Sequence, residues 1–401
     1  MKTERSNMEH SFYNVGHAES ILIKPDSRTL IVRDLGKNKK ANVNYVQNFK
    51  LAYDEIIHAF NAGLDIDTII SHAHADHIDG FTDLLNTYTP PHKIFRTAYL
   101  PKQDFSNSKT LHYVLLRFSV YCVLICGKKT RASQRAKNWL NFRPTINALS
   151  QNIQEVSLGD TITTWSKNAT ILWPPSFNND YPDYAEKDYK RLLRSVEALD
   201  TMQSPEFLEE LRETNQKLSE LLALSEENEE TSEIKQLLDS LTSSFRNGST
   251  NRQSPLTFNI PTMTAYKHCI DNDSLVFAFD DHSALYLSDL YSDAMSSMIK
   301  ANPQIVLNYQ LLKSAHHGTR ICTELQTNGH FDEIVHCCGI TNANYGGPII
   351  DYNSCTNGKV YCLDWDRTNT ALWDPKVPQD PKTKILDPSK NAERVLTLQT
   401  P

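Results

Sequence analysis

Two hydrophobic patterns stand out along this chain of 401 residues. The apolar run Thr68-Ile69-Ile70 leads directly into a polar stretch, which predicts a buried strand that ends in a loop. Between about Tyr184 and Phe245 there is no glycine and leucines recur at helical spacing, which predicts helices. Pro205 and the acidic run 225–230 divide this stretch into roughly three helices. The spaced leucines are Leu208, Leu211, Leu218, Leu222, Leu237, Leu238 and Leu241.

The polar stretch after the apolar run holds three histidines and an aspartate within six residues, namely His72, His74, Asp76 and His77. Imidazole nitrogen and carboxylate oxygen are good zinc ligands, and their close spacing lets one loop wrap an ion. His72 and His74 can face one ion while Asp76 and His77 face a second. A polar loop with chance histidines is the alternative, but the pattern His-x-His-x-Asp-His rarely arises at random. We therefore predict a site for one or two divalent ions, with Zn²⁺ expected and Mn²⁺ as the alternative.

This motif resembles that of the metallo-β-lactamase superfamily, whose members carry it after an early strand of a four-layer αβ/βα sandwich. The resemblance implies an α/β fold of this kind, here with a helical insertion. Other segments match the family: an opening hairpin that ends in an Asp-x-Gly turn, two paired strands that lead to a metal-bridging aspartate, and a strand that delivers the last histidine. These segments are 14–23, 31–36, 272–276, 284–289 and 311–319.

The His-His-Gly-Thr sequence at 316–319 and the Asn-x-Ser-Leu-Val segment at 272–276 narrow the resemblance. They are similar to the hydrolase domain of the ComEC/Rec2 DNA-uptake proteins, and segments 341–348 and 357–361 resemble the closing segments of that branch. The resemblance is more specific for the fold and the metal site than for the substrate.

The resemblance also implies roles for the later residues of the site. Asp289 corresponds to the bridging aspartate, and either His316 or His317 corresponds to the last histidine ligand. We favour His316 because it comes first after the strand, although the sequence alone does not separate the two. His317 would then hold substrate or protonate a leaving group, so His317 and Asp76 are the catalytic candidates.

Two supporting residues and one gap complete the predicted site. His17 and Asp34 are expected to orient ligands from behind, with local turn hydrogen bonds as the alternative. The family commonly supplies another metal histidine before the bridging aspartate, but no histidine in that range has a Gly-His-like context. The first ion is therefore expected to have three protein ligands, or the site to hold one tight and one weak ion. The histidines in question are His92, His112, His268 and His282.

Composition and charge restrict the remaining possibilities. A hydrophobic content of 39% can bury a large core, and a formal charge of −7 means that any surface for a polyanion must be local. The first twelve residues show no signal peptide, and the longest apolar run, 114–126, is too short to span a bilayer. The eight scattered cysteines favour free thiols in a reducing compartment. We therefore expect a cytoplasmic protein without a membrane segment.

Two segments depart from the family pattern and set the predicted domain organisation. Residues 1–176 and 269–401 are expected to form the hydrolase domain, and residues 177–268 a helical insertion that is helical over about 184–245. This insertion would shape substrate access, self-associate or bind a protein partner, and a self-packed cap is the alternative.

The other departure is a basic and apolar insertion within the hydrolase domain, residues 105–143. Its cations lie close to aromatic residues with no acidic residue between them, a pattern that suits a phosphate backbone and base stacking. A solvated helix face with Trp139 docked on the core is the alternative. The candidate nucleic-acid contacts are Lys128, Lys129, Arg131, Arg135, Lys137 and Trp139.

The sequence is compatible with three functions of different classes. The leading one is a metal-dependent hydrolase, specifically a phosphodiesterase or nuclease that uses a metal-activated hydroxide. The second is a hydrolase of a small molecule such as a phosphoester, cyclic nucleotide, lactone or thioester. The third is a non-enzymatic module that binds a partner through its helical insertion, and it is the least economical because most of the ligand set is present.

Overall fold

The structure is a computed structural model, and its chain divides into two compact units that are described separately. Unit 1 comprises residues 1–101, 154–176 and 271–401, and unit 2 comprises 102–153 and 177–270. No helix within the described part of the chain is long and apolar enough to cross a membrane. The described residues are 7–37, 43–87, 93–126, 130–175, 183–223, 236–243, 259–302, 305, 307–337, 351–363, 382–387 and 389–400.

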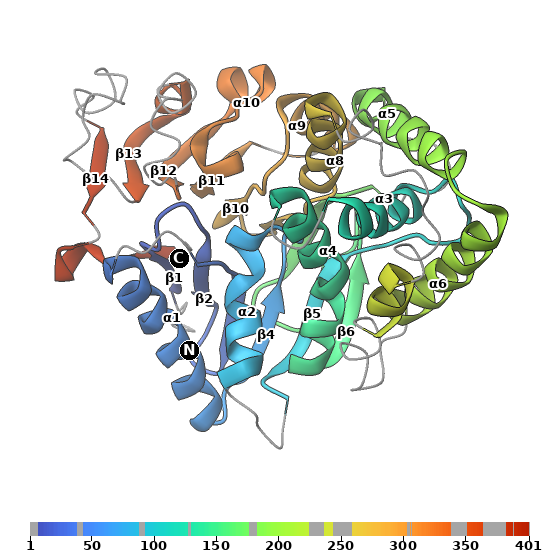
Figure 1. The fold of residues 1–401 in the computed structure, drawn as a ribbon. Coiled ribbons are helices and arrows are strands. Elements are labelled where there is room, and N and C mark those ends of the chain that lie inside the picture. Colours follow the sequence, from blue (N-terminus) through green and yellow to red (C-terminus); the bar gives the residue numbers. More distant parts are fainter. Residues whose placement is uncertain are drawn as a thin grey trace. The chain divides into compact units, whose positions relative to one another are not determined.

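Two mixed β-sheets form the centre of unit 1 (Figure 1). Sheet A has the strand order β15-β1-β2-β3-β4-β5-β6 and sheet B the order β14-β13-β12-β11-β10-β9-β8-β7. The strands of sheet A are β1 (Met8–Tyr13), β2 (Ser20–Lys24), β3 (Thr29–Leu35), β4 (Asp65–Ile69), β5 (Phe95–Pro101), β6 (Ser150–Val156) and β15 (Val395–Thr400). Those of sheet B are β7 (Thr161–Ile162), β8 (Ala169–Trp173), β9 (Val276–Phe279), β10 (Ala284–Tyr286), β11 (Asn308–Lys313), β12 (His330–His336), β13 (Thr356–Leu363) and β14 (Thr383–Leu386).

Both sheets combine an antiparallel part with a parallel part. In sheet A the strands β1, β2 and β3 pair antiparallel, and β3, β4 and β5 pair parallel. In sheet B the strands β8, β9 and β10 pair antiparallel, and β10 to β14 pair parallel. The carboxyl ends of parallel strands meet at one edge of a sheet, so the loops after them can share a site.

Alternation along the strands shows that each sheet is buried on both faces. Phe12 and Ile31 of sheet A belong to one hydrophobic core with Phe277 and Leu311 of sheet B. The residues that alternate with them, such as Val32, are also fully buried, which requires a cover on the other face. Figure 1 shows α1 (Val43–Asn61) and α2 (Ala75–Thr87) against sheet A, and α9 (Ser292–Ala301) and α10 (Thr323–Asn328) beside sheet B. The predicted α/β class and four-layer αβ/βα sandwich are confirmed.

Helix α1 illustrates how the sequence places these outer layers. Its buried residues recur at helical spacing, so one stripe faces sheet A. The helix ends where Gly63 takes a positive φ of 75°, and the Leu64 amide then donates to Ala59 O at 3.0 Å. This is the left-handed glycine termination that stops a helix and returns the chain to the next strand.

One predicted strand begins later than expected. The sequence suggested a strand over 272–276, but β9 begins at Val276. Residues 271 and 272 instead end α8 (Ile260–Asn272), and the turn that follows them carries Asp273 and Ser274. The reason is local, because the Ser274 amide donates to Asp271 O at 3.2 Å and closes a turn where a strand would need an extended chain.

Unit 2 is a bundle of helices. The apolar helix α3 (Leu111–Ile125) packs against α4 (Arg131–Leu149), α5 (Asp183–Asp200) and α6 (Pro205–Ala223), and residues 236–243 are also helical. Pro205 opens α6, where its missing amide hydrogen costs nothing. The predicted leucines Leu211, Leu218 and Leu241 are buried. The domain boundaries remain a prediction, although 102–153 groups here with 177–270 rather than with the sandwich.

The basic and apolar insertion, 105–143, includes α3 and the first two thirds of α4, and its described cations from Arg131 onward lie at the start of α4. Arg131 is exposed and Arg135 and Lys137 are half-buried, whereas Trp139 is only 4% exposed. A buried indole presents no open face to a base, so its burial agrees with the alternative in which Trp139 docks on the core. Several positions named above lie outside the described residues: Lys128, Lys129, His92, 225–230 and 341–348.

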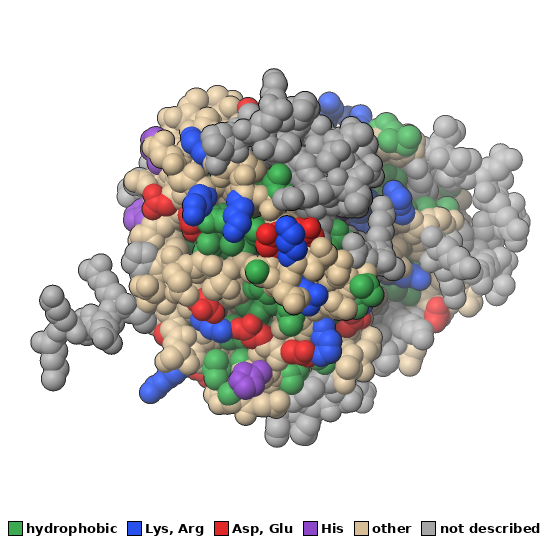
Figure 2. Space-filling view, turned by 90° about the vertical axis from the view of Figure 1, so that its left-hand side faces the viewer, with side chains coloured by type: hydrophobic (Ala, Val, Ile, Leu, Met, Phe, Trp, Pro, Cys, Tyr) green, Lys and Arg blue, Asp and Glu red, His purple; other side chains and the backbone are tan. Residues whose placement is uncertain are grey.

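Charged side chains are mixed on the face of the molecule drawn in Figure 2. Lysine and arginine side chains lie interspersed with aspartate and glutamate side chains there, and no large patch of one sign stands out. This view gives no support for a broad polyanion-binding surface on that face. The seven cysteines of the described residues are all free thiols.

Candidate metal centre

The predicted metal residues come from three places in unit 1 and meet at one site. His72 and His74 lie in the loop after β4, and Asp76 and His77 lie in the first turn of α2, which begins at Ala75. The expected strand and the loop after it are therefore present, but two of the predicted ligands lie on a helix. The other residues of the site follow β10 and β11: Asp289, His316 and His317.

The first cluster consists of His72, His74, Asp271 and Asp289. His72 Nε2 lies 2.9 Å from His74 Nδ1 and 3.8 Å from Asp289 Oδ2. Asp271 Oδ1 lies 3.0 Å from His74 Nδ1 and 3.9 Å from His72 Nε2. All four residues are buried, so their donor atoms converge on a space that solvent does not fill freely.

The second cluster shares Asp289 and adds Asp76, His77 and His317. Asp289 Oδ2 lies 3.5 Å from His77 Nε2 and 3.8 Å from His317 Nε2. His317 Nε2 lies 3.3 Å from Asp76 Oδ2. Asp289 therefore stands between the two clusters, as expected of a carboxylate that bridges two ions.

Hydrogen bonds on the far side of the rings turn Nε2 of two histidines toward the centre. His77 Nδ1 lies 2.9 Å from Asp34 Oδ2, and His317 Nδ1 donates to Cys337 O at 2.9 Å. Glu19 is also near these rings, but it faces Nδ1 of both, at 3.9 Å from His77 and 3.7 Å from His317. We therefore place Glu19 behind the ligands rather than among them.

Glu19 is held in a buried ion-pair network below the centre. Arg33 Nη1 lies 2.6 Å from Glu19 Oε2, and Lys313 Nζ contacts Glu19 Oε1. Arg33 also lies 3.3 Å from Asp34 Oδ2. Breaking a buried pair on one side is strongly destabilising, so these four residues fix the base of the centre.

Backbone conformation aims the two consecutive histidines. Asp34, His316 and His317 have φ values of 54°, 42° and 59°, a region that costs roughly 1–3 kcal/mol for a non-glycine residue. Gly318 continues this turn at φ +86°, and a Cβ there would lie 2.6 Å from His336 Nδ1. The His-His-Gly sequence thus makes a tight turn that brings both rings to the centre.

His316 and His317 take different positions in that turn. His316 Nε2 lies 3.7 Å from Asp289 Oδ2 and 4.0 Å from Asp271 Oδ2, whereas His317 lies beside Asp76. The geometry thus places His317 within the second cluster and His316 at the edge of the first. The preference for His316 as the ligand remains a prediction.

The electrostatics of the centre suit a cation. Burial alone would raise the pKa of Asp289, but the neighbouring imidazoles, His316 foremost, hold that pKa well below its usual range. The same balance applies to Asp76, whose pKa is held well below its usual range chiefly by the hydrogen bond with His317. Burial lowers the pKa of His72 to about 3, so this imidazole keeps a nitrogen lone pair for a metal.

The two supporting residues predicted from the sequence lie at different places. Asp34 contacts His77 behind the second cluster and accepts from the Ser71 amide at 2.8 Å. His17 Nε2 is 3.6 Å from Asp76 Oδ2, and its side chain is 28% exposed. His17 is therefore partly open to solvent, whereas Asp34 is fully buried.

Three residues of the site were not identified from the sequence: Glu19, Asp271 and Arg320. Asp271 directly precedes the segment 272–276, and the expectation of a strand there concealed the turn that presents it. Arg320 lies two residues after His-His-Gly and donates to Asp271 Oδ2 at 3.1 Å. Glu19 lies within the predicted opening hairpin, in segment 14–23. Only its burial beside Arg33 shows that it is part of the site.

The described histidines that were considered for the missing ligand lie elsewhere. His112 Nδ1 accepts from the Asp104 amide at 2.8 Å, and His268 Nδ1 lies 2.8 Å from Asp188 Oδ2. His282 packs its ring against Tyr309, with ring centroids 5.2 Å apart. These three therefore do not join the clusters.

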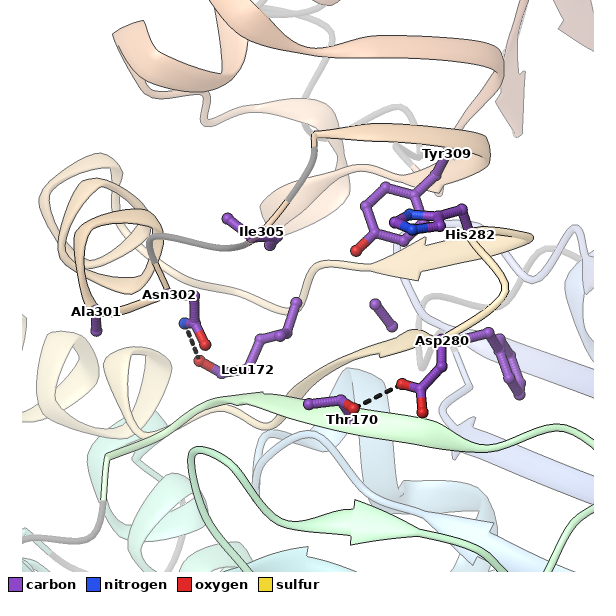
Figure 3. A pocket seen from close by; sticks show the side chains of 10 residues that line it. Thr170, Leu172, Asp280, His282, Ala301, Asn302, Ile305 and Tyr309 are labelled. Carbon is purple, nitrogen blue, oxygen red and sulfur yellow. Dashed lines mark hydrogen bonds between the residues drawn. The ribbon is translucent and has the colours of Figure 1, made fainter.

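The contact of His282 with Tyr309 belongs to a separate hollow of about 480 Å³ in unit 1 (Figure 3). Thr170 Oγ1 donates to Asp280 Oδ1 at 2.6 Å, and Asn302 Nδ2 donates to Leu172 O at 3.2 Å along its wall. None of the predicted metal residues lines it, so the hollow is separate from the metal centre.

The donor set fits a pair of divalent ions. Asp289 Oδ1 is buried without a hydrogen-bond partner among the described residues, which is costly unless an ion fills the space beside it. The two clusters, in which every residue except the partly exposed Asp76 is buried, are consistent with a binuclear metal site.

No family model and no curated protein matches this chain. Among solved structures it is similar to the metallo-beta-lactamase fold protein YhfI from Bacillus subtilis, with a TM-score of 0.36 and 11% identity over 88% of this chain and 96% of that one. It is also similar to a diphosphatase from the PhnP family, with a TM-score of 0.35 and 10% identity over 98% and 97% of the two chains. The layers and strand order described above, rather than either likeness, define the fold.

Proposed function

We propose that this protein is a metal-dependent hydrolase that cleaves phosphodiester bonds. The observation that carries the proposal is the convergence of His72, His74, His77 and His317 on the shared carboxylate of Asp289. When bound, divalent ions in the two clusters would act as Lewis acids and lower the pKa of water, which suits attack on phosphorus.

The residues of this chain then have distinct tasks. Asp76 and His77 hold the second cluster from the first turn of α2, where the positive end of the helix dipole helps to keep a carboxylate ionised. His17 and His316 are partly exposed, with side-chain exposures of 28% and 14%, so they face an incoming substrate. They would donate hydrogen bonds to a bound ester or a proton to its leaving group.

A nucleic acid is the substrate that we propose first. The cations Arg131, Arg135 and Lys137 line the start of α4 and would neutralise phosphates. The resemblance to the ComEC/Rec2 branch supports the same choice. Binding through these cations should weaken linearly with the logarithm of salt concentration, and neutralising them together should flatten that slope.

A small phosphoester is the second candidate. The buried position of Trp139 favours it, because the segment then lacks the open aromatic face that single-stranded nucleic acid would stack on. We further propose that the helices of 183–223 bind a partner or a second copy, and that the protein is cytoplasmic, which its free thiols support.

The test combines metal analysis with a panel of substrates. Single- and double-stranded DNA, RNA, bis-p-nitrophenyl phosphate and a β-lactam are offered to protein loaded with Zn²⁺ or Mn²⁺. Turnover of the phosphodiesters that a chelator abolishes supports the proposal, and the ratio of polymer to small-ester turnover separates the two substrate classes. Hydrolysis of only the β-lactam, or absence of bound metal, would overturn it.

A further inference from the structure

The first cluster presents a carboxylate where the resemblance would place a third histidine. His112, His268 and His282 make contacts elsewhere, whereas Asp271 lies next to His72 and His74. We propose that Asp271 is a metal ligand and that it gives the first ion a set of two imidazoles and two carboxylates. This inference rests on the metal centre of the proposed function and names one of its ligands.

The separations between donor atoms fit a single ion. A tetrahedral ion with ligands at roughly 2.0–2.2 Å separates its donor atoms by about 3.4 Å. The distances here scatter around that value. His72 Nε2 lies 2.9 Å from His74 Nδ1 and 3.8 Å from Asp289 Oδ2. Asp271 Oδ1 lies 3.0 Å from His74 Nδ1 and 3.9 Å from His72 Nε2. Asp271 therefore closes a four-donor shell rather than lying outside it.

A second observation fixes which oxygen of Asp271 points to the ion. Arg320 Nη2 donates to Asp271 Oδ2 at 3.1 Å, and Arg320 Nη1 donates to Asp289 O at 2.5 Å. The guanidinium also lies over the Tyr291 ring, 3.3 Å from its centroid. One oxygen of Asp271 is thus held by a stacked arginine, and the other, Oδ1, is directed at the two histidines. Arg320 acts as a positioning residue.

The backbone around Asp271 is tied to the ligand loop. The Leu275 amide donates to Ser71 O at 2.8 Å, one residue before His72. Trp173 Nε1 donates to Asn272 O at 2.8 Å, and the Tyr291 amide donates to Asn272 Oδ1 at 3.1 Å. These bonds fix the turn independently of any ion, so Asp271 is preorganised in the way that ligand sites require.

Exchange of an imidazole for a carboxylate changes which ions the cluster prefers. Asp271 adds a negative charge to the first cluster that a third imidazole would not contribute. Carboxylate oxygens suit harder ions such as Mn²⁺, whereas imidazoles suit Zn²⁺. The cluster with Asp271 should therefore discriminate less strongly against Mn²⁺ than a cluster with three histidines.

The test measures metal binding and not turnover. Zn²⁺ and Mn²⁺ affinities are determined by equilibrium dialysis for the wild type and for Asp271→Ala, Asp271→Asn and Asp271→His. Removal of a residue that only hydrogen-bonds to a metal ligand already lowers the metal affinity about 10–100-fold. Asp271→Ala should therefore lower the affinity for one of the two ions at least tenfold. Asp271→His should raise the ratio of Zn²⁺ to Mn²⁺ affinity.

Asp67→Asn is the matched control. Asp67 is also a fully buried aspartate paired with an arginine, since its Oδ2 lies 2.5 Å from Arg96 Nη2, but it belongs to neither cluster. Circular dichroism verifies that each variant is folded, and the isosteric Asp271→Asn serves if Asp271→Ala does not fold. Should Asp67→Asn keep both affinities while the Asp271 variants lose one, Asp271 is a ligand.

Two negative outcomes have different meanings. If the wild type binds two ions and every folded Asp271 variant binds both with unchanged affinity and unchanged selectivity, Asp271 is not a ligand and the metal centre stands without it. If the wild type binds neither ion, the proposed function itself fails.

Discussion

His77 Nδ1 lies 2.9 Å from Asp34 Oδ2, and this contact turns His77 Nε2 toward Asp289. We predict that Asp34→Asn weakens metal binding by about 10–100-fold, because a neutral amide oxygen is a weaker acceptor for the N–H of the His77 ring than a carboxylate oxygen is. Asparagine tolerates the left-handed φ of 54° at this position, so the backbone should be preserved. Dialysis against Zn²⁺ measures the affinity.

The control for this prediction is Asp54→Asn. Asp54 is an exposed carboxylate on α1. Its Oδ2 lies 2.6 Å from Lys50 Nζ. This change should leave the zinc affinity as it is in the wild type. Equal affinities for the wild type and Asp34→Asn would contradict an orienting role for Asp34.

Asp76 and Asp289 should both be required for metal binding and for turnover. Replacement of either by alanine removes a charge that neutralises the ions, and in the case of Asp289 a charge shared by both clusters. We predict that Asp289→Ala reduces the bound metal more than Asp76→Ala does, and that both abolish turnover of bis-p-nitrophenyl phosphate. Elemental analysis of the purified proteins gives the stoichiometry. Full occupancy in both variants would remove these residues from the ligand set.

The sequence predicted the site better than it predicted its surroundings. His72, His74, Asp76 and His77 are close in sequence, so their spacing alone determines that they meet. Asp289 and His317 come from distant strands, and only a resemblance could pair them with the motif. Asp271 was missed because a segment as short as 272–276 looks the same whether a strand starts at 272 or a turn precedes it.

The helical region shows a second limit of sequence reasoning. Leucine spacing placed α6 and the helical residues 236–243 well, since periodicity is a local property. Whether those helices form a separable arm depends on tertiary contacts, and here α3 packs against both of them. A helix that is buried on nearly all sides, as α3 is, cannot lose its neighbours without exposing apolar surface.

Gly318 gives a prediction about stability. Alanine at this position keeps φ +86°, which costs roughly 1–2 kcal/mol, and its Cβ also meets the His336 ring at 2.6 Å. Gly159→Ala is a matched control, because Gly159 has φ +91° and nothing within 4 Å of the place that an added methyl group would take. Urea denaturation should show a larger loss of unfolding free energy for Gly318→Ala. Equal losses would mean that the His336 ring moves away from the added methyl group at no cost in unfolding free energy.

His10 gives a prediction about acid stability that does not depend on the metal ligands. The ring is fully buried, with Nδ1 2.6 Å from Tyr286 Oη and Nε2 2.9 Å from Thr400 Oγ1. Burial, followed by the charge of Lys167, lowers the pKa of His10 from 6.5 to about 3. Between these two values the unfolded chain binds a proton that the folded protein does not bind. Stability is therefore lost as the pH falls below 6.5.

The size of this effect can be isolated by comparison with His10→Asn, which keeps an acceptor for Tyr286 but does not titrate. Between pH 6.5 and 5 the wild type should lose roughly 1.5 kcal/mol of unfolding free energy more than the variant does, because each pKa unit of difference corresponds to about 1.4 kcal/mol. Urea titrations at several pH values measure both curves, and all other titrating groups cancel in their difference. If the His10→Asn curve runs parallel to that of the wild type, His10 accepts a proton in the folded state, and its burial does not exclude the charged form.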